Sequence, residues 1–137
     1  AEREAAQRRL LTSQEETIRE LSTPLIPLED GVLVVPLVGR IDRVRAATLL
    51  ERLLAGVVAR RATVAILDIT GISVVDAEVA ASLIQTARAI KLLGARAILT
   101  GVQPAVAAHL VDLDIDLEGL VVVDSLQSAL ARVRARR

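Results

Sequence analysis

Apolar runs that alternate with segments of helical period constrain the fold of this chain more than any other feature of its sequence. TVAILDI (63–69), RAILT (96–100) and LVVV (120–123) are apolar nearly throughout, as expected of strands buried on both faces. The segments that follow them repeat apolar residues every three or four positions, which indicates amphipathic helices. Strands that alternate with helices imply right-handed crossovers and a largely parallel sheet. The sequence therefore predicts an α/β fold.

Two further strands are expected near the start of this region. GVLVVPLVG (31–39) is a continuous apolar run after a Glu-Asp-Gly turn, and residues 24–28 can pair with it as the first strand of a hairpin. Pro36 lacks an N–H group, so it should lie at an edge or a bulge. The predicted order is β-β-α-β-α-β-α-β-α, with helices over 43–60, 77–93, 104–113 and 125–135.

Capping residues fix where the predicted helices begin and end. Asp42 and Asp76 precede periodic segments as N-caps, Pro104 suits the first position of a helix, and Gly94 supplies a left-handed residue after one. Asp124 or Ser125 is expected to cap the last helix. The predicted core-facing residues are Ala47, Leu50, Leu54 and Val57 in the first helix, Val79, Ala80, Leu83, Ile84, Ala87 and Ile90 in the second, and Leu126, Leu130 and Val133 in the last.

Residues 1–22 differ from the rest because they are polar and helix-prone, with a narrow stripe formed by Leu11, Ile18 and Leu21. Two interpretations remain open for them: a solvated linker helix, or a short coiled-coil stalk that leads from another domain. STPLIP ends this helix, since its prolines do not fit inside one. We therefore expect a linker helix over 1–22 and one domain over 23–137.

The composition excludes several classes of function. Lys and Arg number 17, Asp and Glu also number 17, and Phe, Tyr and Trp are absent. A neutral chain without aromatic side chains offers neither electrostatic attraction to nucleic acid nor a platform for stacking bases. With no cysteine there is no zinc thiolate or thiol nucleophile. No apolar run is long enough to span a membrane, and we expect a soluble, cytoplasmic protein with no nucleic-acid or membrane partner.

Candidate catalytic and metal sites are weak. DLDIDLE (112–118) resembles the front of a calcium loop but lacks the loop glycine, and Val123 stands where a bidentate glutamate is needed. His109 is the sole histidine and lies next to the apolar positions of a predicted helix. A lone histidine in such a place is usually a packing or surface residue. Asp68 ends a strand as a phosphoacceptor aspartate would, but the sole lysine, Lys91, is on a helix. The sequence predicts no enzyme, no cofactor and no metal.

The stretch DITGISVVDA (68–77) carries the strongest functional signal. A buried strand ends, turns on Gly71 and passes to a helix capped by Asp76. Exposed N–H groups at a helix start carry partial positive charge, and a phosphorylated hydroxyl there would change partner choice. We interpret this turn as a surface for binding other proteins. Its candidate residues are Thr70, Gly71, Ser73, Asp76, Ala77 and Glu78.

The motifs STPLIP, LDITG, VVD, LIQTA, LLGA, LTG and QP together resemble the STAS domain of RsbR-type stressosome scaffold proteins, in the anti-sigma factor antagonist family. The resemblance covers about Ile18 to Val133. It implies a mixed sheet with helices mainly on one side. It also implies a non-catalytic module that forms a homo-dimer and higher oligomers, joins a smaller STAS partner protein, and sequesters a serine/threonine switch kinase in the general stress response.

The chain departs from that family at the residue after the VVD aspartate. The family usually has a phosphorylatable Ser or Thr there, whereas this chain has Ala77. Some relatives have a second acceptor near His109, but residues 104–113 contain no Ser or Thr. Thr70, Ser73 and Thr100 remain as hydroxyls near the same end of the sheet without matching the usual acceptor. The alanine is either natural or engineered, and in both cases the site is expected to be silent.

Asp114 is a further departure, because relatives tend to have glycine there. We expect it to end helix 104–113 in the left-handed region, which aspartate tolerates better than most residues. The alternative function is a ligand-binding STAS module that takes a nucleotide or small anion at the turns after strands 63–69 and 96–100. The absence of Lys and Arg from 68–84 argues against that alternative.

Overall fold

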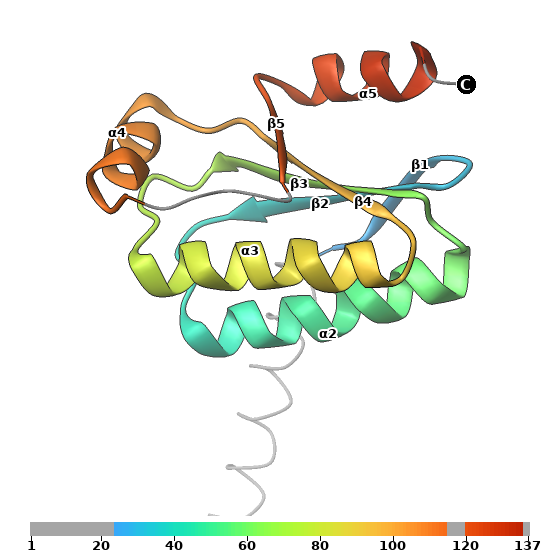
Figure 1. Ribbon diagram of the computed structural model, residues 1–137, viewed down its shortest axis with the longest axis horizontal. Coiled ribbons are helices and arrows are strands. Elements are labelled where there is room, and N and C mark those ends of the chain that lie inside the picture. Colours follow the sequence, from blue (N-terminus) through green and yellow to red (C-terminus); the bar gives the residue numbers. More distant parts are fainter. Residues whose placement is uncertain (1–23, 115–119, 136–137) are drawn as a thin grey trace, which may run out of the picture.

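The computed structural model describes residues 24–114 and 120–135, which form one five-stranded sheet in the order β1-β2-β3-β4-β5. β1 runs antiparallel to β2, and the other neighbouring strands are parallel. The predicted mixed, largely parallel α/β fold is confirmed, and Figure 1 shows its layers. The elements are β1 (Ile26–Glu29), β2 (Val32–Val38), α2 (Arg43–Arg60), β3 (Val64–Gly71), α3 (Ala77–Leu92), β4 (Arg96–Thr100), α4 (Pro104–Asp112), β5 (Val121–Val123) and α5 (Leu126–Ala135).

The first two strands form the predicted hairpin, with Ile26 opposite Val34. Gly31 turns the chain with a φ of 78°, a value that residues with a side chain rarely adopt. Pro36 is paired with Asp68 of β3, and the register between these strands shifts immediately after it. The prediction that Pro36 lies at a bulge is therefore confirmed, because its missing N–H falls where the ladder is irregular.

Two aliphatic cores lie on opposite faces of the sheet. The larger one joins the sheet to α2, α3 and α4, and the smaller one lies between the sheet and α5. Figure 1 shows α2 and α3 side by side below the sheet and α5 above it. Arg134 of α5 pairs with Glu29 at the hairpin, donating from Nε at 2.7 Å. The helices lie mainly on one side, as the resemblance implies.

Of the inward face predicted for α2, Val57 is buried as expected, but the other three residues were wrong by one position. Ala47 is exposed, and Leu50 and Leu54 are only half-buried. The residues that the helix buries are Ala46, Leu49, Leu53 and Val57. α2 carries two adjacent apolar stripes. Periodicity alone does not decide which stripe is buried against the sheet and which one stays partly exposed beside it.

The residues predicted to begin or end helices from α3 to α5 are confirmed. Pro104 begins α4, and Gly94 has a φ of 85°. Asp114 follows α4 with a φ of 53°, the left-handed conformation expected of it. Ser125, rather than Asp124, caps α5 by accepting from the Ser128 N–H at 3.1 Å.

Residues 1–22, for which a linker helix is predicted, and most of DLDIDLE lie outside the described residues. Within 24–114 and 120–135, no helix has the length and apolar character that a bilayer span requires.

Candidate functional site

The parallel strands β2, β3 and β4 end at one edge of the sheet, and α2, α3 and α4 begin there. This follows from the topology, because each crossover connection returns its helix antiparallel to the strand before it. Figure 1 shows the starts of α2 and α3 next to each other at this edge. The turn DITGISVVDA therefore lies among three helix starts, where polar groups from distant parts of the sequence can meet.

Two buried anchors set the shape of the turn between β3 and α3. Ile72 and Val75 are each 1% exposed, whereas Val74 between them is 73% exposed. With every third residue held in the core, the intervening side chains are turned outward. Besides Val74, the exposed residues of this turn are the six candidates, called the 70–78 surface below: Thr70, Gly71, Ser73, Asp76, Ala77 and Glu78. The six candidate residues are thus brought together on one accessible surface.

Thr70 is held by groups from two turns. Its backbone N–H and its hydroxyl both donate to Asp68 Oδ1, at 2.9 and 2.5 Å. Gln103, immediately before α4, donates from Nε2 to the Thr70 carbonyl at 2.6 Å. Gly101 lies against the same group, because a Cβ there would overlap Thr70 Oγ1 and approach Asp68 Oδ1 to 2.9 Å. The turns after β3 and β4 therefore form one unit.

Asp76 starts α3 as the sequence predicts. Its Oδ1 accepts from the Val79 N–H at 2.8 Å, which satisfies one of the unpaired donors in the first turn. Ala77 is the first residue of the helix, and its methyl group is exposed. A hydroxyl at this position would be accessible from solvent at a helix N-terminus. Alanine supplies no oxygen there, so this position can contact a partner protein but cannot accept a phosphate.

Sequence reasoning placed the start of α2 correctly but missed that it lies next to the 70–78 surface. Arg40 and Arg43 are exposed beside the 70–78 surface, and Arg45 folds back to donate from Nη1 to the Arg40 carbonyl at 2.8 Å. The Gly39 N–H donates to the Gly71 carbonyl at 3.2 Å, which joins the two loops. The absence of Lys and Arg from 68–84 says nothing about these arginines, because they precede that segment in the sequence. The pairing of β2 with β3 is the signal that could have placed them.

Thr100 is the one candidate hydroxyl that burial removes from consideration. Its exposed fraction is 0%, whereas Thr70 and Ser73 are exposed. Thr100 Oγ1 also has no hydrogen-bond partner. A kinase cannot reach a side chain inside the sheet, and a buried hydroxyl without a partner is destabilising.

Replacing Thr100 with valine is therefore expected to raise the free energy of unfolding by about 1 kcal/mol, because a methyl group takes the place of an unsatisfied hydroxyl. Urea unfolding measures it. Thr86→Val is the matched control, since Thr86 is also buried but its hydroxyl donates to the Ser82 carbonyl at 2.8 Å. Equal losses of stability in both variants would contradict this account.

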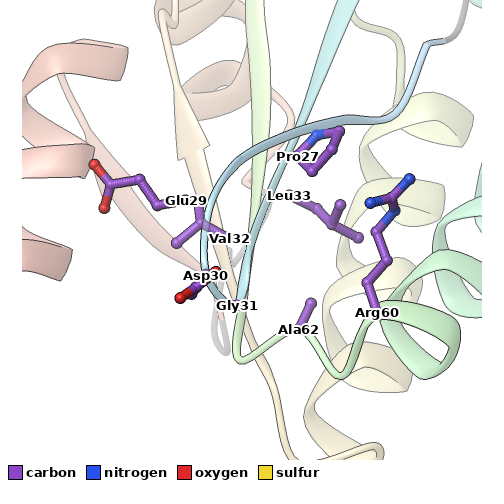
Figure 2. A pocket seen from close by; sticks show the side chains of 8 residues that line it. All are labelled: Pro27, Glu29, Asp30, Gly31, Val32, Leu33, Arg60 and Ala62. Atoms are coloured by element: carbon purple, nitrogen blue, oxygen red, sulfur yellow. The ribbon is translucent and has the colours of Figure 1, made fainter.

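Two hollows of the described part of the chain lie away from the 70–78 surface. One, of about 150 Å³, lies between the hairpin turn and the end of α2. Figure 2 shows Arg60 on one side of it and the Glu29 side chain extending away toward α5. The other, of about 300 Å³, lies where β4 and β5 begin and is lined by Lys91, Arg96 and apolar residues. Neither hollow adjoins the turns after β3 and β4, where the alternative function places a bound anion.

Metal and catalytic candidates gain no support from the geometry. Among residues 24–114 and 120–135, no three His, Asp or Glu side chains gather as metal ligands would. His109 is exposed on α4, outside the buried pair Val106 and Leu110. No acid, base and nucleophile meet at the 70–78 surface. What the arrangement offers is an accessible surface that carries the acidic side chains Asp76 and Glu78, with the exposed Arg40 and Arg43 at the neighbouring start of α2.

Comparison with known proteins places this geometry in a family. The model of the STAS domain matches residues 23–129. The chain therefore belongs to the STAS domain family. SpoIIAA, an anti-sigma factor antagonist solved in its unphosphorylated form, shares the fold with a TM-score of 0.67 at 17% identity, over 82% of this chain and 96% of that one.

Within this family the chain is similar to the RsbR proteins. It is 44% identical over 117 residues to the RsbT co-antagonist protein RsbRA of Bacillus subtilis, covering 85% of this chain and 43% of RsbRA. It is 40% identical over 121 residues to RsbRD of the same organism, covering 88% of this chain and 44% of RsbRD. The chain thus spans less than half the length of these relatives. RsbS of Moorella thermoacetica matches with a TM-score of 0.71 at 31% identity, over 84% of this chain and 98% of that one.

Proposed function

We propose that this chain is a non-catalytic scaffold module of a stressosome, which binds a smaller STAS protein and a serine/threonine switch kinase. The relatives RsbRA and RsbRD are named as co-antagonists of RsbT, and a solved structure of the stressosome itself matches with a TM-score of 0.67 at 29% identity, over 82% of this chain and 97% of that one. A kinase of the RsbT kind is the partner that these similarities favour. Its sequestration keeps the stress response off.

The 70–78 surface is the single observation that carries this proposal. Ile72 and Val75 anchor it in the core, and the bonds of Asp68 and Gln103 to Thr70 fix its start. A surface held rigid before binding loses little conformational entropy when a partner docks. Ala77 lies inside it and supplies no hydroxyl. We therefore assign this surface to partner binding, with its phosphorylation switch silent in this chain.

Residues 1–22 are proposed to connect this module to a further region, and residues 23–137 to form the STAS module. The alternative, a module that binds a nucleotide or small anion, gains less support. Arg40 and Arg43 do bring positive charge to the edge, but both hollows described above lie elsewhere. Small ligands are normally held in concave pockets.

Binding to a purified RsbT-type kinase and an RsbS-type partner tests the proposal. We expect a complex by sedimentation velocity, and at least about a 10-fold loss of kinase affinity for Ala77→Glu, because a new charge enters the contact. Ala55→Glu is the matched control, since Ala55 is an exposed alanine in the middle of α2. A chain that binds neither protein, or two variants that bind equally well, would remove the basis for this function.

A further inference from the structure

The larger of the two hollows, of about 300 Å³, lies at the edge of the sheet opposite the 70–78 surface and is called the β4–β5 hollow below. The strands β4 and β5 begin at this edge, and α3 ends there. Figure 1 shows the end of α3 on one side of the molecule and α4 on the other. The β4–β5 hollow is therefore separate from the surface that is assigned to partner proteins.

The register of the last two strands leaves the start of β4 open. Pairing of β5 with β4 begins with Val121 opposite Ile98. Arg96 and Ala97, the first two residues of β4, pair with β3 on one side. On their other side they have no partner strand among the described residues. The β4–β5 hollow lies against this open start of the strand.

Four of the six described residues that line the β4–β5 hollow are apolar: Ala95, Ala97, Leu120 and Val121. Ala95 and Ala97 are nearly fully buried, at 2% and 3% exposure, and the other two are half-buried. The small side chains at 95 and 97 leave space that larger residues would fill. Such a lining favours a ligand that removes hydrocarbon from water.

The other two lining residues are cations. Lys91 lies in the last turn of α3 and is exposed, and Arg96 is the first residue of β4 and is half-buried. Among the described residues, no Asp or Glu lines the β4–β5 hollow, and neither cation is part of an ion pair. Two positive charges beside apolar walls attract an anion, and a guanidinium can hold a carboxylate through two parallel hydrogen bonds.

We propose that the β4–β5 hollow binds a small organic carboxylate that carries an apolar chain. The carboxylate pairs with Arg96 and Lys91, and the chain lies against the apolar walls. The volume is at the lower end of the range of about 300–1,000 Å³ that is usual for ligand pockets, so the ligand is small. This site differs from that of the alternative function, which places an anion at the turns after β3 and β4, on the other edge of the sheet.

Both parts of the ligand follow from the lining. An inorganic anion would pair with the cations but leave the apolar walls in contact with water. A neutral apolar molecule would fill the hollow but leave the cations without a partner. A docked protein needs about 800 Å² of surface on each side, far more than a hollow with six described lining residues offers. An apolar carboxylate satisfies the walls and the charges together.

Titration of the full chain with octanoate tests the proposal by calorimetry and by amide NMR. We expect saturable binding of one octanoate per chain, with the largest amide shifts at the start of β4. Acetate, inorganic phosphate and 1-octanol should each bind at least about 10-fold more weakly, because each lacks either the chain or the charge. Arg96→Gln should weaken octanoate binding at least about 10-fold. Lys91→Gln should weaken it about 3-fold, because this side chain is more exposed.

Arg88→Gln is the matched control, because Arg88 is an exposed arginine of α3 that does not line the β4–β5 hollow. It should leave octanoate binding unchanged, and circular dichroism verifies that each variant is folded. No saturable binding, 1-octanol binding as tightly as octanoate, or equal affinity in all three variants overturns the proposal. If the chain binds the kinase but not octanoate, only this inference is wrong. If it binds octanoate as expected but no kinase, only the proposed function is wrong.

Discussion

Replacing Gly101 with alanine is expected to lower the free energy of unfolding by about 3 kcal/mol, since two costs add. Gly101 has a φ of 75°, in the region that disfavours side chains. Its added Cβ would also overlap Thr70 Oγ1 and approach the Thr70 backbone N to 2.9 Å. The clash falls where the turns after β3 and β4 meet, so the variant should also disturb partner binding through the 70–78 surface. Urea unfolding measures the loss of stability.

Gly94→Ala is the matched control for this prediction. Gly94 has a φ of 85°, yet a Cβ there would meet no atom within 4 Å. The Gly94→Ala variant should therefore lose only the cost of the strained backbone conformation, about 1 kcal/mol of its free energy of unfolding. Truncating Thr70 to alanine in the Gly101→Ala background should recover part of the loss, because the overlapping hydroxyl is removed. Equal losses for the two glycine variants would mean that the turns do not pack as described.

Ala77→Thr is expected to turn a chain that takes up no phosphate at its 70–78 surface into one that is phosphorylated stoichiometrically by a cognate switch kinase. The hydroxyl would stand exposed at the first position of α3, one residue after the cap Asp76. The resulting dianion lies beside Asp76 and Glu78 and makes the 70–78 surface more negative, so kinase affinity should then fall. Mass spectrometry of the labelled protein locates the phosphate.

Ala81→Thr is the control, because Ala81 is exposed on α3 about one turn further along the helix. It should remain unlabelled. Efficient labelling of the unaltered chain at Thr70 or Ser73 would show that the switch lies elsewhere on the surface. The structure makes Thr70 a poor acceptor, because its hydroxyl already donates to Asp68 Oδ1.

Local chemistry explains which features could be predicted from the sequence. Asp42 and Asp76 each accept from the residue three positions later, and Asp114 takes the left-handed conformation expected after α4. Such caps are specified within a few residues, so they can be read from a short stretch of sequence. Alternation of apolar runs with helical segments likewise specifies parallel strands in order.

Features that depend on distant residues could not be predicted in this way. The face of α2 was misassigned because Ala46 and Ala47, and Leu49 and Leu50, are neighbouring apolar residues that give two equivalent stripes. Packing against the sheet and α3 decides between them. Contacts such as Gln103 with the Thr70 carbonyl join residues 33 positions apart. They become visible only when the strand order brings two turns together.

Hydrogen exchange of the chain, with and without an RsbT-type kinase, tests most directly whether the 70–78 surface binds partners. We expect kinase binding to slow exchange of backbone amides in the turn between β3 and α3, including the exposed Ser73 and Ala77. The hairpin turn at Gly31, at the other end of β2, should exchange unchanged. Protection at the hairpin turn with none between β3 and α3 would contradict the account.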